Sequence, residues 1–236
     1  MNISLGTWFN VPVTIHWSTL VFYLFLSFLS QQYILVFPLL FLIVLLHEFG
    51  HIIAAQKCGM ETYSIILTPL GGLASIDMSR ITPKKELITT LAGPAVNLFL
   101  APFLYGVAFF FDTSTFIGNS AWLIAHLNLL MLFFNIIPAF PLDGGRILRS
   151  LLAFKFNFVK STRWAVMVSK VFAVLFFLAI FTGQFMLAAI AVFIWIAGDQ
   201  ELKQVESTIH YQDSSNTRNK LAELEDRVRN ALRQNN

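Results

Sequence analysis

The stretch "LIVLLHEFGHIIAAQ", residues 42–56, decides the fold, because it places titratable side chains in an apolar run that is suited to lipid. An ionisable residue inside a membrane span costs free energy and therefore indicates function by default. On a helix, His47 and His51 share one face, so both imidazoles can reach one metal ion, with Glu48 beside them as a general base. The alternative is that all three side chains are hydrogen-bonded inside a helix bundle.

The composition is that of a membrane protein. Of 236 residues, 56% are hydrophobic and 12% are charged, whereas about a quarter of the residues in soluble domains are charged. The one cysteine, Cys58, excludes an internal disulfide and a cysteine-only metal site. The basic residues are scattered, so no nucleic-acid binding is expected. The first residues lack the basic leader of a signal peptide.

Apolar segments predict an all-α polytopic membrane protein with about six spans, since each span needs about 20 apolar residues. The expected spans are residues 15–31, 34–57, 85–111, 119–141 and two halves of 164–198, divided at 182–184. Basic residues, Arg80 among them, lie in alternate loops and in the tail. The positive-inside rule therefore places both termini in the cytoplasm and the histidines toward the cytoplasmic side. Lys170 is expected to snorkel from the fifth span.

Two segments outside the spans have a pattern of their own. Residues 61–77, "ETYSIILTPLGGLASID", predict a small β-hairpin or paired strands on the cytoplasmic side, between spans two and three. The first 198 residues are predicted to form the membrane domain. Residues 199–236 are predicted to be a polar cytoplasmic tail with a short amphipathic helix. The apolar positions of that helix are Leu221, Leu224, Val228 and Leu232.

Catalytic zinc needs three protein ligands and one open position, so a third ligand must lie elsewhere. The candidates are His16, Glu61, Asp77, Glu86, Asp112, His126 and Asp143. Asp112 lies on the wrong side of the membrane. His126 is in the outer half of its span, which favours a helix–helix hydrogen bond. His16, next to Trp17, is better explained as an interfacial residue.

Asp143 fits better, because it follows the fourth span in "NIIPAFPLDGGRILRS", residues 135–150. Pro138 and Pro141 break the helix, and irregular backbone is tolerated at membrane depth where it lines a cavity. An unwound segment can therefore bring Asp143 back to the histidines. The competing interpretation is that Asp143 only caps the helix that begins at Gly144. Asn135 can point into the same cavity.

The two motifs, H-E-x-x-H at 47–51 and N-x-x-P-x-x-P-L-D-G at 135–144, resemble those of the site-2 protease family of intramembrane zinc metalloproteases, peptidase family M50. Further matches are "NVPVTIHWS" at 10–18, "PLGG" at 69–72 and "AGPAVN" at 92–97. The resemblance implies one Zn²⁺ held by His47, His51 and Asp143. It also implies that Glu48 is the base and that Asn135 binds substrate or stabilises the oxyanion. The layout resembles the small pro-sigma-factor processing branch, although the tail is too short for the CBS repeats often found there.

This resemblance implies a membrane enzyme that hydrolyses peptide bonds within or near the transmembrane segment of membrane-anchored, single-span proteins. We expect it in a prokaryotic cell membrane, acting in regulated intramembrane proteolysis, with a homodimer or a regulatory membrane partner left open. The 61–77 strands can hold an unwound substrate by strand addition. Two rival hypotheses are a metal-ion transporter, for which the sequence offers no internal repeat, and a catalytically silent binding protein. Gly93–Pro94 is interpreted as a kink or a close helix contact.

Overall fold

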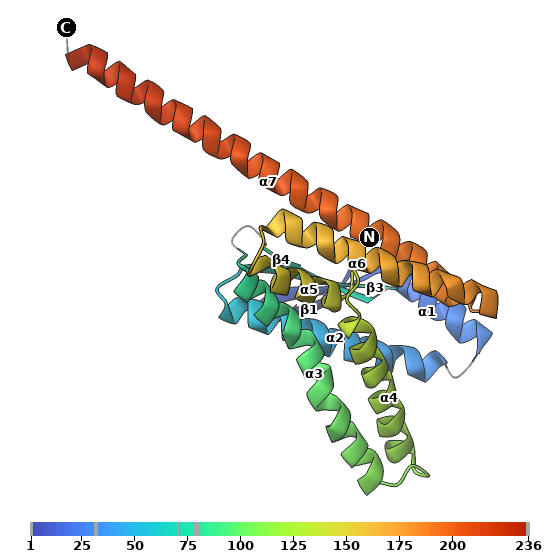
Figure 1. Ribbon diagram of the computed structural model, residues 1–236. Helices are drawn as coiled ribbons and strands as arrows, with labels where there is room; N and C mark the ends of the chain where they lie inside the picture. Colours follow the sequence, from blue (N-terminus) through green and yellow to red (C-terminus); the bar gives the residue numbers. More distant parts are fainter. Residues whose placement is uncertain (1, 31–32, 70, 78–80, 235–236) are drawn as a thin grey trace.

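The computed structural model describes residues 2–30, 33–69, 71–77 and 81–234. Beyond Thr208, side chains are described only at Arg218 and Lys220. The side chains at the predicted apolar positions of the tail helix are therefore not described, and Leu70 and Arg80 lie outside the described residues. The tail itself is helical, because it continues the last long helix without a break (Figure 1).

Within this described part, five helices are long and apolar enough to cross a membrane. They are α2 (Tyr33–Lys57), α3 (Pro83–Phe110), α4 (Phe116–Ile136), α6 (Phe158–Leu178) and the first half of α7 (Phe185–Gln234). The predicted first span corresponds to α1 (Trp17–Leu29), which has 13 residues. Such a helix is about 20 Å long, which is shorter than the roughly 30 Å hydrocarbon layer. The chain is thus a largely helical membrane protein, and a sixth span stays a prediction.

Local sequence signals explain where the spanning helices begin and end. Thr82 caps α3 by accepting a hydrogen bond from the Lys85 amide, and Pro83 takes the first turn, where its missing N–H costs nothing. Thr115 caps α4 in the same way, and α4 ends at Ile136 rather than at 141 because Pro138 follows. Together, α3 and α4 form an antiparallel pair that projects from the rest of the molecule (Figure 1).

A four-stranded sheet lies beside α2, in the order β1 (Asn2–Trp8), β2 (Val11–His16), β3 (Thr62–Thr68) and β4 (Gly71–Ile76). The predicted hairpin at 61–77 is confirmed as β3 and β4, which pair antiparallel. The expected all-α class with one small strand region is confirmed in part: the chain is mostly helical, but residues 2–16 form a second hairpin whose β2 pairs parallel with β3. Its two-residue turn holds Phe9 and Asn10 at φ values of 52° and 61°, as a tight hairpin turn requires.

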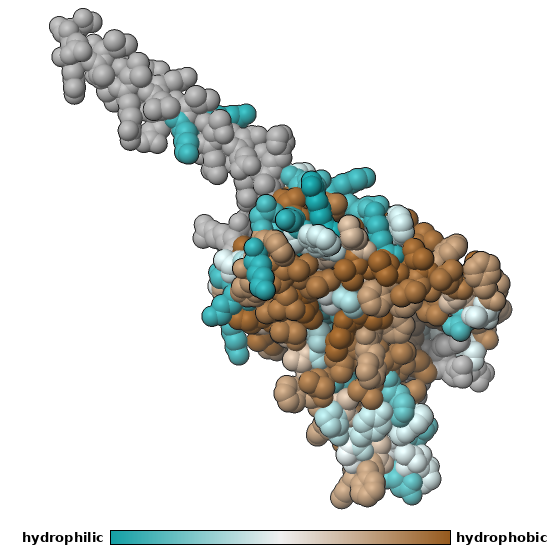
Figure 2. Space-filling view, in the orientation of Figure 1, coloured by the Kyte–Doolittle hydropathy of each residue, from teal (hydrophilic) through white to brown (hydrophobic). Residues whose placement is uncertain are grey.

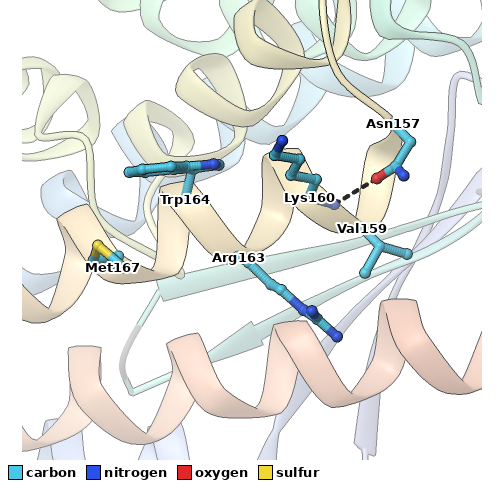
Figure 3. Close-up of a pocket in the computed structure, with 6 residues that line it drawn as sticks. All are labelled: Asn157, Val159, Lys160, Arg163, Trp164 and Met167. Atoms are coloured by element: carbon cyan, nitrogen blue, oxygen red, sulfur yellow. Dashed lines mark hydrogen bonds between the residues drawn. The ribbon is translucent and has the colours of Figure 1, made fainter.

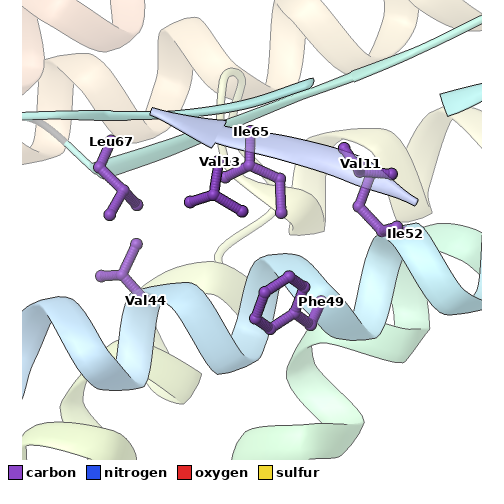
Figure 4. Close-up of a cluster of buried hydrophobic side chains, with 7 residues drawn as sticks. All are labelled: Val11, Val13, Val44, Phe49, Ile52, Ile65 and Leu67. Carbon is purple, nitrogen blue, oxygen red and sulfur yellow. The ribbon is translucent and has the colours of Figure 1, made fainter. Parts of the chain in front are cut away.

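The sheet is held to α2 by a cluster of buried apolar side chains (Figure 4). Those from β2 and β3 point toward one face of α2, and the seven residues are Val11, Val13, Ile65, Leu67, Val44, Phe49 and Ile52. Four of them, Val11, Val13, Ile52 and Ile65, are completely buried. Burying an aliphatic side chain of this size stabilises the fold by about 1.5–3 kcal/mol. The helix that carries the H-E-x-x-H motif is therefore anchored through an apolar face that adjoins the face with the histidines.

The C-terminal part contains α5 (Asp143–Ala153), α6, the short 3₁₀ helix η1 (Ala179–Thr182) and α7. The division predicted at 182–184 is confirmed, since Gly183 ends η1 with a left-handed φ of 78°. Lys170 forms an ion pair with Asp199, with Nζ 2.7 Å from Oδ1, and also lies over the Trp195 ring. The compact part presents broad apolar surfaces, as expected for contact with lipid, and hydrophilic side chains gather where α7 leaves it (Figure 2).

Candidate metal centre

Three side chains from two helices converge at the level of the H-E-x-x-H motif. In α2, the Nε2 atoms of His47 and His51 are 3.1 Å apart. Asp143, the first residue of α5, places Oδ2 3.0 Å from Nε2 of His47 and 3.3 Å from Nε2 of His51. Ligands on a tetrahedral zinc ion, with bonds of about 2.0–2.1 Å, are about 3.3 Å apart. The three atoms therefore have the spacing of one face of a zinc coordination tetrahedron.

The orientation of His51 is fixed by a hydrogen bond on the other side of its ring. Its Nδ1–H donates to the backbone carbonyl of Thr89 in α3 at 2.9 Å, which leaves the Nε2 lone pair directed toward Asp143. Metal-binding histidines commonly have such a partner, because it sets the tautomer and the ring angle. Both histidines are nearly buried, with 2% of His47 and 8% of His51 exposed.

Asp143 reaches the histidines because the chain unwinds after α4 and turns back. Residue Leu142, not Asp143, is the N-cap of α5, and it makes no side-chain capping bond. The structure therefore does not use the Asp143 carboxylate as a helix cap. Two glycines let the new helix pack on the turn: a Cβ on Gly144 would lie 2.2 Å from the carbonyl oxygen of Ile137, and one on Gly145 2.7 Å from the Phe140 amide.

Gly93 of α3 forms the wall beside the histidines. A Cβ at this position would lie 2.3 Å from Nε2 of His51 and 2.8 Å from Cε1 of His47, which no real side chain tolerates. The sequence interpretation of Gly93 as a kink or helix contact missed this role. Its only signal was the "AGPAVN" match, because the proximity depends on how α3 packs against α2.

Glu48 lies between the metal centre and the sheet. Its side chain is nearly buried, and a Cβ on Gly72 of β4 would lie 2.4 Å from its Cγ atom. The backbone of β4 therefore runs directly against this carboxylate. Asn135 is half-buried in the last turn of α4, at the start of the unwound segment. It is not one of the three converging groups.

The other candidate ligands are occupied elsewhere. Glu86 pairs with Arg149. His126 lies 3.3 Å from the Tyr105 hydroxyl, and so forms the expected contact between α4 and α3. The remaining ones lie at turns and strand ends: His16 caps α1, Glu61 accepts a bond from the Tyr63 hydroxyl, Asp112 accepts one from the Ser114 amide, and the Asp77 amide donates to the Glu61 carbonyl.

A shallow pocket on the outer face of α6 is separate from the metal centre. Figure 3 shows its lining, in which Lys160 and Arg163 point to different sides and the Asn157 side chain caps the helix through the Lys160 amide. Val159, Trp164 and Met167 complete it. None of the converging ligands contributes to this pocket.

Comparisons with known proteins all point to the same protein family. A model of peptidase family M50 matches residues 35–120 and 112–179. Zinc metalloprotease MJ0392 of Methanocaldococcus jannaschii is 34% identical over 214 residues, which are 87% of this chain and 62% of that protein. Stage IV sporulation protein FB of Bacillus subtilis is 31% identical over 58% of this chain and 46% of its own length.

The fold gives the same result. The solved site-2 protease from Methanocaldococcus jannaschii superimposes with a TM-score of 0.69 and 33% identity, covering 86% of this chain and 95% of that one. This chain spans only 62% of the length of MJ0392 and less than half of the sporulation protein. The motifs, the fold and the matched residues agree: the chain belongs to peptidase family M50, the site-2 protease family.

Proposed function

We propose that this protein is an intramembrane zinc metalloprotease that hydrolyses peptide bonds within or near the transmembrane segment of membrane-anchored proteins. The observation that carries the proposal is the convergence of His47, His51 and Asp143 beside Glu48, on a helix apolar enough to span a membrane. In a member of a peptidase family, this set of groups fits peptide hydrolysis better than transport or silent binding.

The residues present fit zinc. Two imidazoles and one carboxylate are a typical catalytic donor set, which leaves a fourth position open. The missing side chain of Gly93 keeps the space beside both histidines free. These three residues would hold the zinc ion, which when bound would act as a Lewis acid toward the scissile carbonyl and the attacking water.

Glu48 performs the proton transfers in this proposal. Its carboxylate takes a proton from the attacking water and returns it to the amine of the leaving peptide. Nearly complete burial keeps bulk water from competing for the carboxylate. Asn135, at the start of the unwound segment, is proposed to donate a hydrogen bond to the substrate carbonyl or to the oxyanion that forms from it.

The substrate must be extended at the site, because the amides of an intact helix are bonded internally. Strand β4 offers a surface for this. It is the last strand in the sheet order, and its Gly72 lies against Glu48. An unwound substrate segment that adds to β4 would run past the carboxylate, in the manner of strand addition. We further propose that the site opens to the cytoplasm, that both termini lie there and that the enzyme acts in regulated proteolysis of single-span proteins in a prokaryotic cell membrane.

Substitution of Glu48 by Gln tests the proposal. The protein and the variant are reconstituted with zinc and a single-span substrate, and cleavage and bound zinc are measured together. Loss of a general base typically lowers the rate by about 10²–10⁴-fold, while zinc content should stay at the wild-type value. Cleavage at the wild-type rate by Glu48→Gln would remove Glu48 from the mechanism. Zinc uptake into proteoliposomes without cleavage would favour the transporter.

A further inference from the structure

A buried ion cluster lies two turns along α5 from Asp143. Arg149 is completely buried, yet its guanidinium contacts two carboxylates from two other helices. Nε and Nη2 donate to Oε1 of Glu86 in α3, and Nη1 donates to Oε1 of Glu201 in α7 at 2.6 Å. Ser150 donates to the second Glu86 oxygen at 2.8 Å. The guanidinium also lies over the ring of Phe140, 5.1 Å from its centroid.

This cluster joins α5, which carries Asp143, to α3, which lies beside the histidines, and to α7. Along α5, Asp143 is about 9 Å from Arg149, at 1.5 Å per residue. Glu86 precedes, by one turn of α3, the Thr89 carbonyl that orients His51. Glu201 belongs to α7, which contributes none of the three converging ligands and continues into the polar tail. Arg149 thus links α7 directly to the helix that carries Asp143.

The buried ion pairs of Arg149 hold α3, α5 and α7 firmly together. Burial alone would lower the pKa of Arg149, but the Glu86 and Glu201 carboxylates outweigh it and raise this pKa above the usual value. The guanidinium therefore stays charged. Removing one member of a buried ion pair leaves an uncompensated charge, which strongly opposes any arrangement in which the contact is broken. Displacing α5 from α7 would also break the ion pair between Arg149 and Glu201, so it is opposed in the same way.

The segment that precedes α5 is held by the same pair of helices. The Phe140 amide donates to Oγ of Ser169 in α6 at 2.9 Å, and Ala139 packs against Ala173 of α6 and Ile194 of α7. Both the approach to Asp143 and the helix that follows it are therefore fixed against α6 and α7.

We propose that Arg149 and Glu201 are positioning residues: through their ion pair, α7 sets where the Asp143 carboxylate stands relative to His47 and His51. The inference deepens the proposed function and rests on it, because it concerns the affinity of the same metal centre. It makes the polar extension of α7 a part of the molecule that can alter the metal centre without touching it.

Glu201→Gln tests this, since it removes the charge and keeps the shape. Glu206→Gln is the matched control. Glu206 lies five residues later in α7 and pairs with Arg163 of α6 at 2.7 Å, but this pair is exposed and does not involve α5. Full-length wild type and both variants, purified in detergent, are titrated with Co²⁺ against a chelator. The visible spectrum reports coordination geometry, and melting of the metal-free protein reports stability.

We expect Glu201→Gln to bind Co²⁺ about tenfold more weakly, the lower end of effects seen for groups behind a metal ligand, with an altered spectrum. Glu206→Gln should match the wild type. Glu201→Asp, which keeps the charge on a shorter stem, should recover part of the loss. It is the variant to compare if Glu201→Gln folds poorly.

Two outcomes would count against the inference, and they can be told apart. Wild-type affinity and spectrum in Glu201→Gln, with or without a lower melting temperature, would overturn the positioning role and leave the metalloprotease intact. Failure of the wild type itself to bind Co²⁺ would overturn the proposed function and this inference with it.

Discussion

Two buried polar clusters lie about two turns of α5 apart, and they differ in what holds them together. At Asp143, three side chains that can each offer an electron pair face one another. At Arg149, a guanidinium stands between two carboxylates, so the protein supplies both signs of charge itself. The first cluster has the composition of a metal site and the second that of a structural support. Substitutions at the first cluster should therefore act mainly on metal binding, whereas substitutions at the second should act mainly on stability and only more weakly on metal binding.

Arg149→Met should have the largest effect, a loss of stability. Losing this cation leaves Glu86 buried without its partner, which should lower the free energy of unfolding by about 3–5 kcal/mol. Unfolding in detergent, followed by circular dichroism, measures it. The control is Arg163→Gln, which breaks an ion pair whose arginine side chain is 64% exposed and should change stability by less than about 1 kcal/mol. Equal effects of the two variants would show that burial of Arg149 carries no special weight.

Asp143→Ala should greatly weaken zinc binding and have little effect on stability. Removing one of three ligands should weaken zinc binding by more than about a hundredfold, beyond the 10–100-fold range for groups behind the ligands. Zinc per chain after dialysis against a weak chelator measures the loss, and unfolding of the metal-free protein should change far less than in Arg149→Met. A variant that keeps its full zinc content would exclude Asp143 as a ligand.

The smallest of the three changes adds one methyl group in α3. In Gly93→Ala the new Cβ would meet the His51 ring, so one imidazole must move and zinc affinity should fall by roughly tenfold or more. Gly106→Ala is the matched control in the same helix, because a Cβ there meets no atom within 4 Å. Competition titration with a zinc indicator compares the two. If both alanine variants bind zinc equally, the histidines do not depend on the space beside Gly93.

Local patterns predicted that the groups of the candidate metal centre could converge. The spacing of His47 and His51 defines one face of a helix wherever that helix packs, and the prolines before Asp143 interrupt a helix in any context. Most spans and the hairpin at 61–77 likewise follow from periodicity and from turn residues.

Features that depend on distant pairing could not be predicted. The parallel pairing of β2 with β3 joins strands separated by two helices. Val11, Val13 and Ile15 alternate with other residues as in a strand, but alternation does not name the partner strand. The role of Gly93 is set by the approach of another helix, and a buried Arg149 looks in the sequence like any basic loop residue. The ion pair of Lys170 could not be predicted either, because its partner, Asp199, lies in another helix.

The pairing of β2 with β3 has a mechanical consequence for α2. Everything from α1 to the end of α2 forms one excursion of the chain whose two ends are fastened to adjacent strands. Rotating α2 by a single residue would turn it by about 100°, and would drag Val44 and Ile52 out of their contact with the sheet. The sheet therefore acts as a rotational stop that keeps the face with His47 and His51 turned toward α3 and α5.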